Sequence, residues 1–115
     1  MITKSRKAKG RRLQNFVRDK ILKVFKHLKK EDVQVALMSQ QGPDIKLSRI
    51  AKRLVPYQFE CKNQEKINIW ESLKQSEENS GDYPPVLVFK RNRSKTYVVL
   101  EIEDFIDLIK RILPE

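Results

Sequence analysis

Apolar residues recur at helical spacing between Leu13 and Leu28, and basic residues fill most of the positions between them. This spacing predicts one long amphipathic helix with an apolar face for the core and a basic outer face. The charges along it are too uniform in sign for a coiled coil. The rest of the chain is therefore expected to cover this helix within one small domain.

Five later segments have the patterns of short strands. Residues 57–62, YQFECK, alternate between two faces, so Glu60 and Lys62 share one face while Cys61 lies on the other. The stretch VLVF is wholly apolar, as in a central buried strand. The predicted strands are residues 33–38, 44–47, 57–62, 86–89 and 97–100.

Helical spacing also predicts helices over residues 69–79 and 102–113, and residues 48–56 are interpreted as a basic connector. The expected order is helix, three strands, helix, two strands, helix, which defines an α/β fold with a central mixed sheet flanked by helices. We expect the last helix to pack on the core. Trp70 is also expected in the core, with a dimer surface as the alternative.

Positive charge is concentrated at the start of the chain. The net charge is +10, and residues 1–30 hold twelve basic residues against a single acidic one. Such a block attracts a polyanion, either nucleic acid or an anionic membrane surface, although a solvated arm has the same composition. We expect residues 1–10 to form a flexible basic arm and residues 11–115 to form a single domain.

Cysteine usage and hydropathy indicate the compartment. The chain of 115 residues has one cysteine, so it forms no intramolecular disulfide. It has neither a secretory apolar region nor an apolar run of about 18 residues, the length that spans a membrane. We therefore expect an intracellular, cytoplasmic protein that does not span a membrane.

Three polar residues stand where a sheet does not ordinarily need them. Asp44 follows Gly42 and Pro43, while Glu60 and Lys62 share a strand face. Two carboxylates and the backbone carbonyl of Cys61 suit Mg²⁺, and we expect Mn²⁺ to substitute. Lys62 would then orient the attacking water or pair with the phosphoryl oxyanion. Alternatively, Asp44 is a turn residue and the other two form a surface ion pair, worth under about 1 kcal/mol.

These residues resemble a known catalytic signature. The stretch GPDI at residues 42–45, followed by FECK at residues 59–62, is similar to that of the PD-(D/E)xK nuclease superfamily. Within it, Lys9-Gly10 and the following RRLQNFVRDKIL resemble the opening of archaeal-type Holliday junction resolvases and their small phage relatives, and the similarity continues to Leu108. The resemblance implies a restriction-endonuclease-like fold, a cytoplasmic setting that includes a phage protein acting in its host, and a catalytic role for Lys62.

The same resemblance assigns further residues. Asp44 and Glu60 become the metal ligands. Gln14 stands where family members have an acidic residue, so it would contact a metal-bound water without adding charge, and we expect one main Mg²⁺ site. Ser39 matches a serine near the phosphate, and Gln64 matches a polar residue after the lysine.

Basic residues before and along the first helix, and in the segment RNRSK, are expected to neutralise DNA phosphates without reading base sequence. With one cysteine and one histidine, structural zinc is excluded. The two related scissile strands of a four-way junction suit a homodimer with twofold symmetry. The expected DNA-binding residues are Lys9, Arg11, Arg12, Arg18, Gln64, Arg91, Arg93 and Lys95.

The expected function is hydrolysis of phosphodiester bonds in branched DNA by a magnesium-dependent endonuclease, most of all the resolution of Holliday junctions in DNA recombination. Two alternatives stay open: a flap or nicking nuclease of phage replication or packaging, and a basic DNA-binding module without catalysis. Membrane binding is disfavoured, because the apolar face of the first helix is committed to a core.

Overall fold

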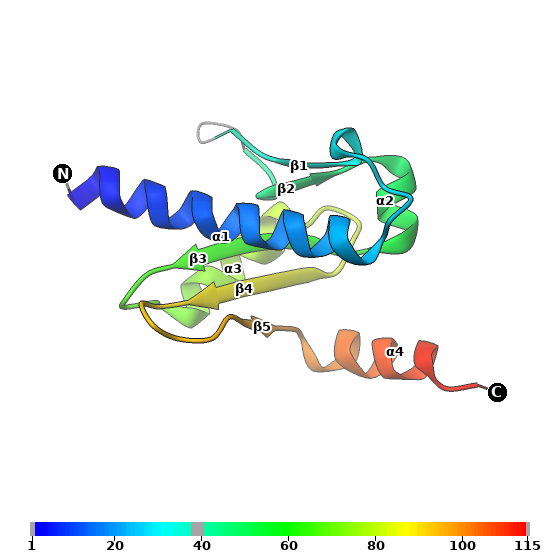
Figure 1. Ribbon diagram of the computed structural model, residues 1–115. Helices are drawn as coiled ribbons and strands as arrows, with labels where there is room; N and C mark the ends of the chain where they lie inside the picture. The colour runs from blue at the N-terminus through cyan, green and yellow to red at the C-terminus, as the bar shows by residue number, and fades with distance from the viewer. Residues whose placement is uncertain (1, 38–40, 115) are drawn as a thin grey trace.

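The computed structural model describes residues 2–37 and 41–114, which form a mixed α/β structure with helices around two small sheets (Figure 1). None of the described helices is long and apolar enough to cross a membrane. In chain order, the elements are α1 (Ile2–Val24), the 3₁₀ turn η1 (Lys30–Asp32), β1 (Val33–Val35), β2 (Ile45–Leu47), α2 (Arg49–Leu54), β3 (Gln58–Asn63), α3 (Ile69–Asn79), β4 (Pro85–Lys90), β5 (Tyr97–Val99) and α4 (Ile102–Ile112).

The strands form two sheets, where the sequence predicted a single central one. Strands β1 and β2 are an antiparallel pair, and the other three form a mixed sheet in the order β3-β4-β5. Strand β4 is central, parallel to β3 and antiparallel to β5, as its apolar sequence predicted. The Asp44 amide donates to the Phe59 carbonyl at 2.9 Å, so the two sheets are joined at Asp44. This junction leaves much of one edge of β3 without a strand partner.

The core lies between α1 and the strands. Leu13, Val17 and Ile21 of α1 pack with Cys61 of β3 and Val88 of β4 in one buried cluster. Helix α3 packs on β3 and β4 as well, behind the sheet in Figure 1. Successive side chains of a strand point to opposite faces, so the face of β3 away from this cluster is turned toward α3.

The segment interpreted as a basic connector contains a helix, α2, which adds an element to the predicted order. Ser48 caps α2, because its hydroxyl accepts a hydrogen bond from the Ala51 amide at 3.2 Å. The hydroxyl also donates to Asp32 Oδ1 at 2.7 Å, which joins α2 to η1. With only six residues, half of them basic, α2 has too short an apolar pattern to be predicted as a helix.

Helix α1 begins at Ile2, so residues 2–10, expected as a flexible arm, are helical. Lysine, arginine and alanine have high helix propensity, which lets the helix continue through Gly10 to its N-terminal end. The side-chain amide of Asn63 donates to the Lys9 carbonyl at 3.0 Å. The first half of α1 is thereby attached to the end of β3.

Two predictions of burial are wrong. Helix α4 has no buried residue, and all its apolar side chains except the half-buried Leu108 are exposed, although the sequence predicted a packed helix. Trp70, expected in the core, is 82% exposed at the start of α3. Apolar periodicity identifies the face of a helix that requires a partner, but it does not show whether the same chain supplies that partner.

Candidate functional site

Five of the predicted site residues line one cavity of about 490 Å³ at the unpaired edge of β3: Gln14, Asp44, Glu60, Cys61 and Lys62. Asp44 lies just before β2, Glu60 and Lys62 lie on β3, and Gln14 comes from α1. Gln14 and Lys62 are distant in the sequence, and packing of α1 on β3 brings them to the same cavity. Ser39 lies outside the described residues.

Asp44 is held by backbone hydrogen bonds on both sides. The Cys61 amide donates to Asp44 Oδ2 at 2.7 Å, and the Asp44 carbonyl accepts from the Ala36 amide at 2.9 Å. Burial raises the pKa of Asp44, while the Cys61 amide, the Lys62 charge and a hydrogen bond from Gln14 oppose that rise. The Asp44 carboxylate is thus fixed in place, but nearby groups only partly offset the cost of burying its negative charge.

Glu60 is 4% exposed and faces α3. The Asn79 side-chain amide donates to Glu60 Oε1 at 3.4 Å, and Lys62 Nζ lies 3.8 Å from Glu60 Oε2. Burial raises the pKa of Glu60, and the negative charge of Asp44 raises it further. The two carboxylates are therefore close enough to repel each other, and one ammonium offsets them only in part.

Cys61 has a structural and a backbone role. Burial raises the pKa of its thiol, with added repulsion from the Asp44 and Glu60 charges, so the buried side chain stays protonated. A strand residue presents its amide and carbonyl to the same edge. Because the Cys61 amide reaches Asp44, the Cys61 carbonyl also lies on the edge that borders the cavity.

The polar groups around the cavity decide whether it can hold a hard divalent cation. The described residues contain no group of three or more His, Cys, Asp or Glu side chains arranged to hold a metal. They do provide two carboxylates, the Cys61 carbonyl edge and Gln14 Oε1, which is buried without a hydrogen-bond partner. Oxygen donors in this number, completed by several waters, fit Mg²⁺, and a coordinated water would supply the donor that Gln14 Oε1 lacks.

Helix α3 contributes residues that the sequence analysis missed. Gln75, Glu78 and Asn79 line the same cavity. A signal for these residues was present in the helix itself. Ser72 and Ser76 are buried, so the inward face of α3 carries polar residues at helical spacing. A polar stripe on an otherwise ordinary helix indicates a polar strand face opposite it, here Glu60 and Lys62.

Predicted DNA-binding residues divide among separate surfaces. Lys9 and Gln64 line a cavity of about 500 Å³ beside Asn63, just past the end of β3, together with Arg6 and Lys66. This basic cavity therefore adjoins the strand that carries Glu60 and Lys62. Its residues Asn63 and Gln64 directly follow Lys62 along the chain.

The remaining basic residues lie elsewhere. Arg11 and Arg18 line a cavity with β1 and β2, and Arg18 pairs with Asp19 at 2.9 Å. Arg12 and Lys95 border a groove between α1 and β5. Arg91 and Arg93 are exposed in the turn between β4 and β5, where Arg93 has a φ of 62°. Arg91 lines a further cavity together with Gln64, and Asn63 lines both the basic cavity and the groove of Arg12 and Lys95. The cavity of Arg11 and Arg18 shares no lining residue with these three.

No family model matches the chain, and neither a curated protein nor a solved structure matches it.

Proposed function

We propose that the protein is a magnesium-dependent endonuclease that cleaves branched DNA, with four-way junctions as its preferred substrate. The observation that carries the proposal is that Asp44, Glu60 and Lys62, from two segments separated in the sequence, line one cavity. The similarity of GPDI and FECK to the PD-(D/E)xK signature supports the same reading. The basic surface of α1 supplies attraction for a polyanion.

Each residue has a defined task in this proposal. Asp44 and Glu60 hold Mg²⁺, with the Cys61 carbonyl edge beside them, and the ion supplies Lewis-acid chemistry at the phosphate when bound. Gln14 keeps Asp44 oriented through its amide, and its Oε1, which has no partner in the structure, would accept a hydrogen bond from a metal-bound water. These groups are buried or held by hydrogen bonds, so they are positioned before DNA binds.

Lys62 is the positively charged group of the site. Its side chain is about one-fifth exposed, and Nζ lies 3.8 Å from Glu60 Oε2, too far for a tight hydrogen bond. The ammonium is therefore attracted toward Glu60 while it keeps donors for other partners. We assign it to orienting the attacking water and stabilising negative charge on the phosphate.

The basic cavity beside Asn63 gives the DNA strand a path to this site. Arg6, Lys9 and Lys66 would contact phosphates next to the scissile one, and Gln64 would add an amide. The Asn63 hydrogen bond to the Lys9 carbonyl fixes this part of α1 against β3. Phosphate contacts of this kind position a strand but do not select its sequence, so branch shape would select the substrate.

The test compares labelled substrates under matched conditions. An immobile four-way junction, a flap, a nicked duplex and a linear duplex are incubated with the protein in Mg²⁺ or in EDTA. The proposal expects paired, symmetric cuts in the junction that disappear in EDTA. Faster cutting of flap or nicked DNA would favour the alternative nuclease. Binding of all four without any cut would leave a basic DNA-binding module and refute the enzyme.

A further inference from the structure

Helix α4 presents an apolar face that no described part of the chain covers. Ile102, Phe105, Ile106 and Ile109 lie at helical spacing on that face, and Ile106 is 49% exposed. Ile112 extends the same face to the end of the helix. A contiguous apolar face of this kind marks an interaction surface, because single proteins in water seldom leave one open.

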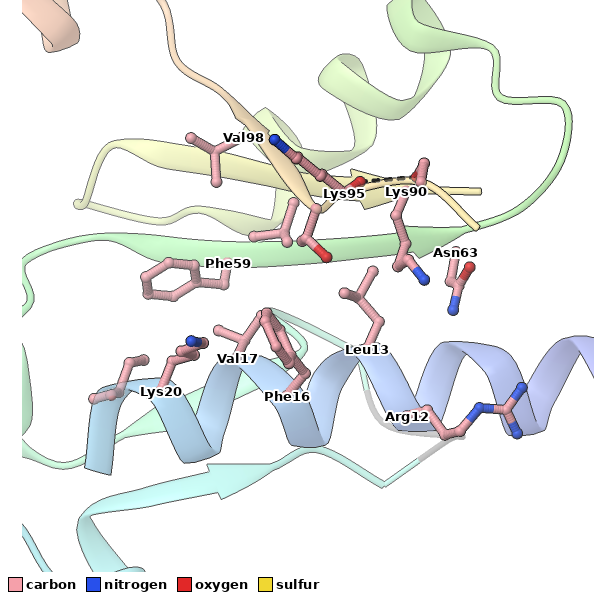
Figure 2. Close-up of a pocket in the computed structure, with 14 residues that line it drawn as sticks. Arg12, Leu13, Phe16, Val17, Lys20, Phe59, Asn63, Lys90, Lys95 and Val98 are labelled. Carbon is pink, nitrogen blue, oxygen red and sulfur yellow. Dashed lines mark hydrogen bonds between the residues drawn. The ribbon is translucent and has the colours of Figure 1, made fainter. Parts of the chain in front are cut away.

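A groove of about 790 Å³ on the same molecule also lacks a partner. We name it the α1–β5 groove; it is lined by Leu13, Phe16, Val17, Phe59, Val88 and Val98. Figure 2 shows the side chains of α1 facing the strands across it. Leu13, Val17 and Val88 are buried at the floor of the groove, whereas Phe16 is 44% exposed and Val98 is 58% exposed, so the apolar residues at its rim are open to a partner.

The charges of the helix and the groove are complementary. The charged residues that line the groove are all basic: Arg12, Lys20, Lys90 and Lys95 (Figure 2). The residues around the start of α4 are acidic: Glu101, Glu103, Asp104 and Asp107. An amphipathic helix with an acidic start thus combines an apolar face with the sign of charge that complements the groove.

The helix of the same chain points away from this groove. Leu100 and the cap residue Glu101 join β5 to α4, and the Glu101 carboxylate accepts from the Glu103 amide at 3.0 Å. Leu100 packs against the core, which fixes where the helix leaves the sheet. In Figure 1, α4 extends away from α1 and from both sheets. A second copy is therefore the source of the occupant.

We propose that two copies of this chain dimerise by placing α4 of each in the α1–β5 groove of the other. The contact is made twice around a twofold axis, which doubles the apolar area covered. The proposal assigns a contact surface to the homodimer of the proposed function. It rests on that function only for the idea that the dimer uses two active sites. A mass measurement tests it without reference to cleavage, so the two proposals fail separately.

The first experiment measures molar mass by light scattering and sedimentation over a range of concentrations. Wild type is expected at twice the chain mass of 13.7 kDa. Ile106→Asp and Phe16→Asp should each raise the dimer dissociation constant by about 30-fold or more. Ile50→Asp, at an exposed apolar residue on α2, is the matched control and should leave the dimer intact. Circular dichroism confirms that each variant is folded.

The second experiment identifies the contact. A chain with Val98→Cys is mixed with a chain carrying Ile106→Cys, and a short bismaleimide is added; the native Cys61 is buried and serves as an internal control. The proposal expects cross-links between the two different chains. Three results would overturn the proposal: a monomeric wild type, a dimer that survives both Ile106→Asp and Phe16→Asp, or a cross-link within one chain when Val98→Cys and Ile106→Cys are combined in that chain.

Discussion

At the scale of single residues, the carboxylate cavity is a site of incomplete charge compensation. Asp44 is partly buried and Glu60 is buried, the two carboxylates are close enough to repel each other, and Lys62 Nζ lies 3.8 Å from Glu60 Oε2. Removing two carboxylates from water costs free energy unless counter-charges are near. This cost makes the site receptive to a cation, and it connects the stability of the protein to both pH and metal.

The pH dependence follows from the sign of the shifts. Burial raises the pKa of Asp44 and of Glu60 above the unfolded value of about 4. The folded protein therefore binds more protons than the unfolded chain, and these groups lower the stability of the metal-free protein as pH rises through their raised pKa values. Above the raised pKa values, the buried charges lower the stability by their full amount. Below the unfolded pKa, both carboxyls are protonated and this loss of stability is absent.

Glu60→Gln tests this dependence by removing one of the charges. In EDTA at neutral pH, we expect the free energy of unfolding of the variant to be about 1 kcal/mol higher than that of wild type. The difference should shrink as pH falls toward 4. Urea unfolding across pH measures it, and Glu77→Gln, at an exposed residue of α3, is the control. A variant equally stable or less stable than wild type at neutral pH would contradict the account.

Gln14 tests the composition of the metal site. Gln14→Glu adds a third carboxylate beside Asp44, so we expect Mg²⁺ affinity to rise by about tenfold and stability in EDTA to fall. Gln75→Glu adds the same charge on the α3 side of the cavity and serves as the matched control. Calorimetric titration with Mg²⁺ measures both. Equal affinity for Gln14→Glu and Gln75→Glu would place the cation away from Asp44.

At the scale of elements, α2 depends on a short relay of side chains. Asp32 accepts from the Lys29 amide and from the Ser48 hydroxyl, at 2.8 and 2.7 Å, and Ser48 in turn caps α2. The Lys29 amide and the Ser48 hydroxyl lower the pKa of Asp32. Its contribution to stability is thus present above the unfolded pKa and is lost as pH falls through the lowered value.

Ser48→Ala removes both the cap and the bond to Asp32. We expect the free energy of unfolding to fall by about 1 kcal/mol at neutral pH, and the loss to be smaller in acid once Asp32 is protonated. Thermal and urea unfolding measure the change. Ser5→Ala, at an exposed position in α1, should have a much smaller effect. A loss that does not change with pH would show that the cap alone contributes.

The elements also show what the sequence could predict. The alternation in YQFECK correctly placed Glu60 and Lys62 opposite Cys61, and the apolar run correctly identified β4 as central. Helix α2 was missed because a six-residue helix has too little periodicity, although Ser48 is a recognisable cap. Asn79 was missed because the polar stripe of α3 indicates a polar inward face but does not show that this face packs against Glu60 on β3.

At the scale of the whole molecule, two surfaces lie apart. The carboxylate cavity is at the edge of β3, while the apolar face of α4 extends beyond β5 (Figure 1). The sequence predicted that α4 would be packed, and the described chain leaves its apolar face bare. Pairing through α4 and the α1–β5 groove would reconcile the pattern with the structure. It would also present two cavities to one branched substrate.

The central claim is that the cavity of Asp44, Glu60 and Lys62 cleaves DNA. The most direct measurement is the single-turnover cleavage rate of an immobile four-way junction in Mg²⁺ for wild type, Asp44→Asn and Asp82→Asn, with junction affinity measured in parallel. We predict that Asp44→Asn loses about a thousandfold or more in rate and keeps or gains affinity, because a charge that repels phosphate is gone. Asp82→Asn, at an exposed carboxylate outside the cavity, should match wild type. Equal rates for all three proteins, or no cleavage by wild type, would contradict the claim.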